Sequence, residues 1–130
     1  MSKAILIADD NPVVLKQVQH IIETQPDLSI CGIAKNGKEA IQKALELNPD
    51  LIILDLSMPV MNGLEAANAI RENLPSVPIL LFTVHKTRFL EAEALAHGIR
   101  AVVGKSDGAE KLLDRTRTFL YCDPEAPASA

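Results

Sequence analysis

Five polar side chains of the sequence stand directly after short apolar segments. Asp9 and Asp10 follow the first such segment, Asp55 follows the third, and Thr83 and Lys105 follow the last two. Three carboxylates gathered in a partly dry cleft repel one another strongly unless a cation lies between them. Mg²⁺ suits such a cluster because it takes oxygen ligands, keeps several waters and commonly serves phosphate chemistry. The sequence therefore predicts a magnesium site with a hydroxyl and an ammonium group beside it.

Each of these residues has an ordinary explanation when it is considered alone. An aspartate after a strand is often only a helix cap, and a single lysine is usually a solvated side chain. Their joint placement at the ends of four apolar segments favours one shared functional site.

The elements that must position this site alternate along the chain. Short apolar, β-branched runs predict strands, and apolar residues at helical spacing predict helices between them. Asn11 is the expected cap of the first helix, with Pro12 at its first position. The predicted strands are 3–8, 28–34, 51–54, 78–82 and 99–103, and the predicted helices are 13–24, 37–47, a third that follows the loop 58–63 and ends at 73, 86–97 and 107–120.

Strands that are apolar throughout and alternate with amphipathic helices are typical of a parallel sheet that is covered on both faces. Five such units predict an open, doubly wound α/β domain with a five-stranded parallel sheet. Right-handed crossovers bring the carboxyl end of every strand to one edge, where ligands bind in this architecture. The five polar side chains are therefore expected to meet at that edge.

Length and composition narrow the possibilities further. The 130 residues correspond to about one domain, and the Pro- and Ala-containing stretch 123–130 without periodicity predicts a disordered tail or the start of a linker after a domain of residues 1–122. With 13 basic and 17 acidic residues the net charge is -4, which disfavours binding to nucleic acid or to an anionic membrane surface. The longest apolar run, 4–8, is too short for a transmembrane or secretory segment. Cys31 and Cys122 are interpreted as reduced thiols, so we expect a cytoplasmic protein.

These residues resemble the signature of a known family. Asp9-Asp10, the stretch 54–63 with its Ser57-Met58-Pro59 loop, Thr83 and Lys105 are similar to the active-site motifs of the response regulator receiver domain of two-component signalling. The resemblance covers residues 3–121. The Asp-Asp-Asn-Pro start and the Lys105-Ser106 pair resemble in particular the receivers of the NarL/FixJ subfamily, which precede a LuxR-type helix-turn-helix. The resemblance also implies a flavodoxin-like (βα)5 fold with the strand order 2-1-3-4-5.

For the acidic cluster, the resemblance implies a division of roles. Asp10 and Asp55 would bind Mg²⁺ directly, with the backbone carbonyl of Ser57 as a third protein ligand. Asp9 would act through a metal-bound water.

The resemblance also implies a signalling reaction rather than turnover of an outside substrate. Asp55 would accept a phosphoryl group from a phosphohistidine of a sensor histidine kinase or a phosphotransfer protein. Lys105 would neutralise charge on the transferring oxygens, and Thr83 would hydrogen-bond the attached group. The chain would then switch conformation to control an output domain or a partner. A homodimer is possible, and a DNA-binding output domain is expected only in a longer protein.

One departure from the family pattern concerns the switch. An aromatic residue usually stands three positions before the lysine, but here this position is Val102. A small side chain cannot bury or expose a ring, so we expect a conformational change confined to the loops near Thr83 and Lys105. A milder departure is Ser106, where many receivers have proline.

Three other functions are weighed against this one. A docking module that signals without phosphorylation is suggested by Val102, but the intact acidic cluster argues against it. A Mg²⁺-dependent phosphatase of the haloacid-dehalogenase type needs a second aspartate where Ser57 stands. A nucleotide-binding P-loop ending in Gly104-Lys105-Ser106 needs a glycine where Ile99 stands.

Overall fold

The computed structural model describes residues 2–84 and 86–121. The predicted tail 123–130 and the domain end at 122 lie outside these residues. Strands and helices alternate along the chain, and the order is β1 (Lys3–Ala8), α1 (Pro12–Glu23), β2 (Leu28–Ala34), α2 (Gly37–Leu47), β3 (Leu51–Leu54), α3 (Gly63–Asn73), β4 (Ile79–Thr83), α4 (Arg88–Ala96), β5 (Ala101–Gly104) and α5 (Ala109–Tyr121).

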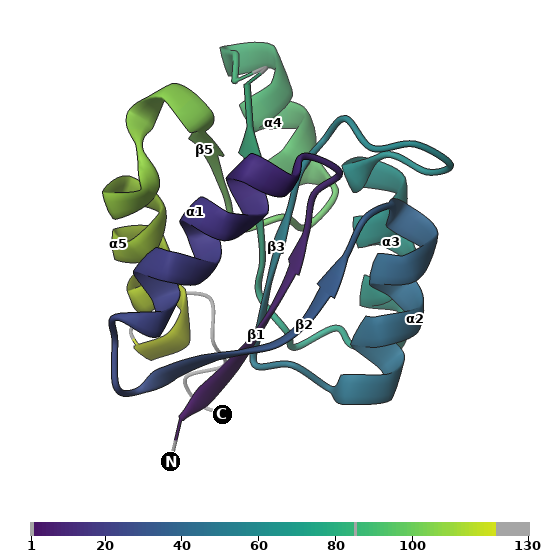
Figure 1. Ribbon diagram of the computed structural model, residues 1–130. Coiled ribbons are helices and arrows are strands. Elements are labelled where there is room, and N and C mark those ends of the chain that lie inside the picture. The colour runs from purple at the N-terminus through teal and green to yellow at the C-terminus, as the bar shows by residue number, and fades with distance from the viewer. Residues whose placement is uncertain (1, 85, 122–130) are drawn as a thin grey trace.

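All strands pair in parallel in one five-stranded sheet with the order β2-β1-β3-β4-β5. Helices α1 and α5 cover one face of the sheet, and α2, α3 and α4 cover the other (Figure 1). The predicted doubly wound α/β fold and its strand order are confirmed. No helix in the described part of the chain is long and apolar enough to cross a membrane.

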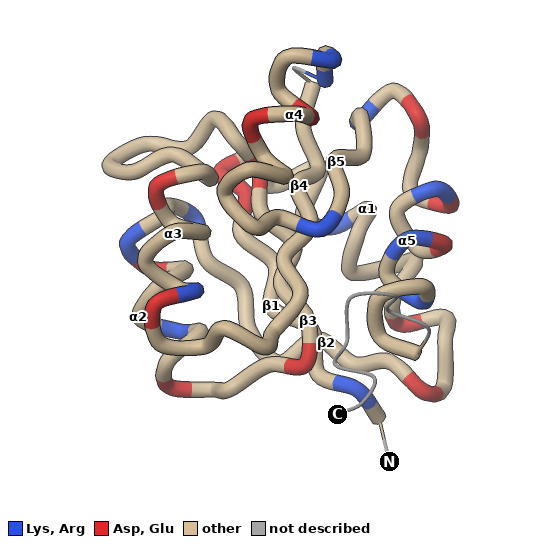
Figure 2. The backbone as a smooth tube through the Cα atoms, turned by 180° about the vertical axis from the view of Figure 1, so that it is seen from behind, with Lys and Arg blue, Asp and Glu red and all other residues tan. Residues whose placement is uncertain are grey.

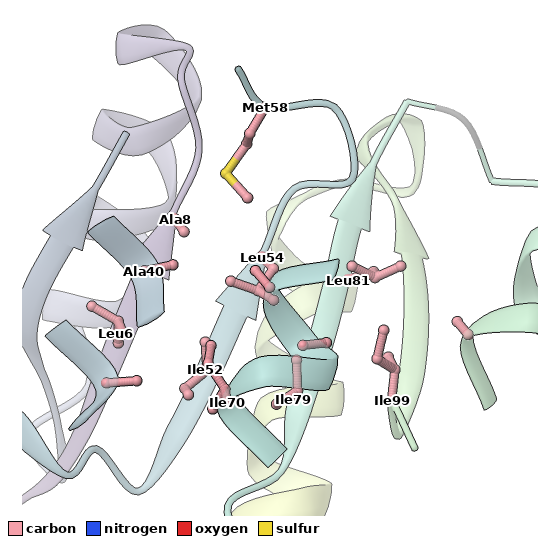
Figure 3. Packing of buried hydrophobic residues seen from close by; sticks show 14 of the residues in the cluster. Leu6, Ala8, Ala40, Ile52, Leu54, Met58, Ile70, Ile79, Leu81 and Ile99 are labelled. Atoms are coloured by element: carbon pink, nitrogen blue, oxygen red, sulfur yellow. The ribbon is translucent and has the colours of Figure 1, made fainter. Parts of the chain in front are cut away.

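Two apolar clusters hold the helices on the sheet. In the first cluster, Leu6, Ile52 and Leu81 of the strands lie on the side of α2, α3 and α4, where Ile70 contributes from α3 (Figure 3). The second cluster joins the opposite face of the strands to α1 and α5. A sheet buried on both faces explains why its strands are apolar throughout instead of alternating.

The first helix begins as predicted. The side chain of Asn11 accepts a hydrogen bond from the backbone N–H of Val13 at 2.9 Å, and Pro12 occupies the first turn. Because the helix starts directly after this cap, Asp9 and Asp10 lie in the short connection between β1 and α1, at the edge of the sheet.

The fourth strand and helix differ from their predicted bounds. Strand β4 includes Thr83, whereas the prediction ended it at 82, and α4 starts at Arg88 instead of 86. Thr87 caps α4, because its hydroxyl oxygen accepts the N–H of Leu90 at 3.0 Å. Lys86 therefore belongs to the β4–α4 loop.

The fifth strand and helix also differ. Strand β5 covers Ala101–Gly104 instead of 99–103, and a short 3₁₀ turn, Lys105–Asp107, stands where the prediction began the last helix. Gly108 has a φ of 93°, a left-handed conformation that stops the turn before α5 begins. Lys105 therefore projects from a tight turn and not from a helix.

Candidate functional site

The carboxyl ends of the central strands bring the predicted acidic residues together. Backbone pairing between neighbouring strands continues for one residue beyond the strand ends. The N–H of Asp9 donates to the carbonyl of Ala34 at 3.0 Å, and the N–H of Asp55 donates to the carbonyl of Ala8 at 2.9 Å. One carboxylate oxygen from each of Asp9, Asp10 and Asp55 lies within 4.8 Å of the others. Figure 2 shows acidic segments gathered at this end of the sheet.

Lys105 joins the cluster from β5. Its ammonium Nζ lies 2.8 Å from Asp9 Oδ2 and 3.5 Å from Asp55 Oδ2. The sequence indicated that these groups share a rim, but it did not indicate that the ammonium pairs chiefly with Asp9. This pairing leaves Asp55 only partly neutralised.

Asp55 is a buried carboxyl with other charges close by. Its side chain is buried, and its Oδ1 has no hydrogen-bond partner among the described residues. Burial raises the pKa of Asp55, and the charge of Asp9 raises it further, while Lys105 and the backbone N–H of Ser57 oppose the rise. A cation or an electrophile that binds Asp55 Oδ1 would therefore stabilise this carboxylate.

The donor set fits a hard divalent cation. It consists of carboxylate oxygens, which Mg²⁺ prefers, and the exposed side chain of Asp10 leaves one side open to water. Asp55 Oδ1, which has no hydrogen-bond partner in the part of the chain that the structure describes, is an oxygen that a cation would satisfy. The site residues therefore suit Mg²⁺ chemically.

Thr83 and Ser57 come from the two elements next to Asp55, namely strand β4 and the loop that follows β3. Thr83 is fully buried at the end of β4, where it is in register with Gly104, the residue before Lys105. Ser57 is exposed on the loop that follows Asp55. Thr83 is thus on the strand between the one that leads to Asp55 and the one that leads to Lys105.

The loop after Asp55 is anchored at both ends. Met58 turns back into the core beside Ala8 and Leu54 (Figure 3). The N–H of Gly63 donates to Leu56 at 2.9 Å, and a Cβ atom at position 63 would collide with the Asp55 carbonyl oxygen. Glycine is required there because the backbone comes close to the acidic residue.

The exposed tip of this loop is strained. Val60 has a φ of 72°, and the N–H of Met61 donates to the Pro59 carbonyl at 2.7 Å, which closes a tight turn. A β-branched residue in left-handed backbone costs roughly 1–2 kcal/mol. The strain lies five residues beyond Asp55, on the loop between β3 and α3.

We expect Val60→Gly to raise the free energy of unfolding by about 0.5–1 kcal/mol, because relief of the strain exceeds the entropy that glycine loses on folding. Urea denaturation measures this change. The matched control is Val84→Gly, at an exposed valine without positive φ, which should lower stability by about 0.5–1 kcal/mol. Equal destabilisation by both variants would show that the Val60 backbone is not strained.

A hollow lies where the family pattern has an aromatic side chain. It measures about 370 Å³ between α4, β5 and α5, and its walls include Leu95, Val102 and Phe119 together with Lys86 and Arg115. Val102 itself is buried. The small valine thus leaves open space next to the strand that leads to Lys105.

Two further charged residues, Lys86 and Asp107, lie at the turn of Lys105, and their residue types gave no clear functional signal in the sequence. Asp107 Oδ2 accepts the N–H of Gly104 at 3.0 Å and lies 3.4 Å from Lys86 Nζ. The signal in the sequence was weak: an aspartate three residues after a glycine that ends a strand.

An open α/β domain with an acidic cluster, a threonine and a lysine at the carboxyl ends of its strands defines a class of signalling domain, and comparison with known proteins agrees. The profile of the response regulator receiver domain matches residues 5–117. The chain therefore belongs to the receiver domain family of two-component response regulators.

Its relatives include regulators of the NarL and LuxR type. The chain is 36% identical over 114 residues to the transcriptional regulatory protein LnrK of Bacillus subtilis, covering 88% of this chain and 52% of LnrK. It is 39% identical over 109 residues to the nitrate/nitrite response regulator NarL of Escherichia coli, covering 84% of this chain and 50% of NarL. The chain thus spans about half the length of these relatives.

Among solved structures, the response regulator domain of Thermotoga maritima CheB is similar throughout. It superposes with a TM-score of 0.88 at 31% sequence identity, covering 95% of this chain and 100% of that domain.

Proposed function

We propose that this domain accepts a phosphoryl group on Asp55 from the phosphohistidine of a sensor histidine kinase or a phosphotransfer protein. The observation that carries the proposal is the state of Asp55: a buried carboxylate with one oxygen that has no hydrogen-bond partner among the described residues, flanked by two further carboxylates and an ammonium. A carboxylate that was only structural would have both oxygens satisfied.

The transfer is a displacement at phosphorus. A carboxylate oxygen of Asp55 forms the new O–P bond, the N–P bond of the donor breaks, and the bonding pair leaves on the imidazole, which takes up a proton. Asp10, Asp55 and the backbone carbonyl of Ser57 would hold Mg²⁺, with Asp9 acting through a water. The bound ion supplies positive charge that neutralises the transferring oxygens.

The chain's own residues supply the remaining positioning. Lys105 brings an ammonium within 3.5 Å of Asp55 Oδ2, where it would neutralise charge on the oxygens of the transferring phosphoryl group. Thr83 is buried on the neighbouring strand, and its hydroxyl would hydrogen-bond the attached group. The phosphorylated domain then hydrolyses the acyl phosphate slowly and returns to its starting state.

The phosphorylated domain would act on an output domain or on a partner. We propose that residues 1–122 form the receiver and that 123–130 are a tail or the start of a linker. Because LnrK and NarL are about twice as long as this chain, a DNA-binding output domain is the proposed target where the receiver is part of a longer regulator. A cytoplasmic location fits a kinase partner of this kind, and homodimerisation is a further possibility for the phosphorylated form.

The test is phosphoryl labelling of the purified chain. With Mg²⁺ and an autophosphorylated histidine kinase or a small acyl phosphate as donor, one acid-labile phosphoryl group per chain is expected. Excess EDTA should suppress it, because the carboxylates would then face the donor without a cation. Labelling at full rate in EDTA would contradict the metal assignment, and no labelling from any donor would favour a docking module that works without phosphorylation.

A further inference from the structure

The turn that presents Lys105 is closed by a side chain at its far end. Asp107 Oδ2 accepts the backbone N–H of Gly104 at 3.0 Å, so the carboxylate bridges the two ends of the 3₁₀ turn. The conformation of this turn decides where the ammonium of Lys105 stands relative to Asp9 and Asp55.

The same carboxylate oxygen reaches the neighbouring loop. Lys86 Nζ lies 3.4 Å from Asp107 Oδ2 and 3.5 Å from Glu91 Oε1. Lys86 stands three residues after Thr83, in the loop between β4 and α4. One lysine thus links the loop after Thr83 to the turn of Lys105.

Local packing and charge both support this arrangement. A Cβ atom at Gly104 would lie 3.0 Å from Asp107 Oδ2 and 3.4 Å from Lys86 Cδ, so glycine leaves the room that both side chains use. The N–H of Gly104, and after it Lys86, lower the pKa of Asp107, which keeps its carboxylate charged.

We propose that Lys86 and Asp107 are positioning residues that couple the loop of Thr83 to the turn of Lys105, so that the two groups approach the phosphoryl site together. This inference rests on the proposed function of Asp55. It assigns a link between the loop after β4 and the turn after β5, in a chain whose residue 102 has no aromatic ring that could couple them.

The ion pair between Lys86 and Asp107 is weak enough to break and form again as the loops move. The two side chains are 37% and 39% exposed, and ion pairs of this kind contribute little to stability. Lys86 also has Glu91 at nearly the same distance, so it can move between carboxylates without losing an ionic partner.

The test is a double-mutant cycle in the intact chain, read as the initial rate of Asp55 labelling by a small acyl phosphate with Mg²⁺. Lys86→Met removes the ammonium and keeps the stem. Asp107→Asn keeps an oxygen for the Gly104 N–H but removes the charge. Each single variant is expected to slow labelling about two- to fivefold, and the double variant no further, because both break one link.

The direction of the two effects separates positioning from simple charge. Lys86→Met makes the rim more negative and Asp107→Asn makes it more positive, so a through-space effect on an anionic donor would slow one reaction and accelerate the other. Positioning slows both. The matched control is Glu91→Gln, which removes the other partner of Lys86 and should leave the rate unchanged.

Opposite effects of the single variants, additive effects in the double variant, or an equal effect of Glu91→Gln would overturn the coupling. Amide chemical shifts of the unphosphorylated chain give a second readout that needs no phosphoryl transfer: Lys86→Met should shift Lys105 and Ser106, and Asp107→Asn should shift Val84. If the wild-type chain takes no label, the proposed function fails, and these cross-loop shifts or their absence still decide whether the link exists.

Discussion

Asp55→Ala is expected to abolish acid-labile phosphoryl labelling of the chain, lowering it at least a hundredfold to background. Asp55 contributes a buried oxygen that has no hydrogen-bond partner within 2–84 and 86–121, and its Oδ2 faces Lys105 at 3.5 Å. Asp9 is occupied by the Lys105 ammonium at 2.8 Å, and Asp10 is exposed, so neither offers an oxygen with the same surroundings. Alanine at 55 therefore removes the nucleophile itself, and no neighbour replaces it.

The measurement is incorporation of radioactive phosphate followed by acid or hydroxylamine treatment, which cleaves acyl phosphates. Asp114→Ala is a suitable control, because this exposed aspartate lies on α5 away from the acidic cluster. It should label like the wild type. Persistent labelling of Asp55→Ala would place the acceptor elsewhere and refute the site assignment.

Asp55→Asn is expected to stabilise the metal-free domain at neutral pH by roughly 1–2 kcal/mol, the scale of an unsatisfied charged group in a buried position. Asparagine has nearly the same shape but removes the repulsion from Asp9 and the cost of burying a charge. Lys105 keeps its closer partner, Asp9, so the substitution leaves no unpaired ammonium. Urea denaturation in EDTA measures the difference.

The pH dependence of this difference has a definite sign. Burial and Asp9 raise the pKa of Asp55 in the folded state above its ordinary value of 3.8, so the folded protein holds this proton more tightly than the unfolded chain does. Stability of the wild type is therefore lost as the pH rises from about 4 through the raised pKa. Asp55→Asn lacks this loss, and the two stability curves should separate with rising pH.

Mg²⁺ provides the control for this prediction. A cation at the carboxylates should stabilise the wild type by mass action and the asparagine variant much less. Parallel pH curves for the two proteins, or an equal response to Mg²⁺, would mean that Asp55 carries no electrostatic burden in the folded state.

The strands could be predicted well because a sheet covered on both faces demands apolar runs. The short apolar run 51–54, for example, fits only a buried strand. The ends of the elements near the site were harder. Thr87 competes with Lys86 for the start of α4 through a side-chain cap, and Gly108 separates a 3₁₀ turn from α5 by its left-handed backbone. Both outcomes depend on single hydrogen bonds or dihedral angles that periodicity does not contain.

The acidic rim was also predictable, because parallel topology sends every strand's carboxyl end to one edge. The partners that the charged side chains choose at that edge could not be predicted. The preference of Lys105 for Asp9, and the link from Asp107 to Lys86, depend on distances between loops that are far apart in the sequence. The strain at Val60 likewise has no signature in its residue type.

The hollow beside Val102 determines which substitutions the fold tolerates at position 102. In a close-packed interior, a larger side chain costs about 1–3 kcal/mol, so selection for folding restrains most buried positions. Position 102 is buried but borders about 370 Å³ of open space, into which the added atoms of leucine, phenylalanine or tyrosine can extend. Selection for folding is therefore weak there, and changes of residue size at 102 can accumulate under selection for signalling alone.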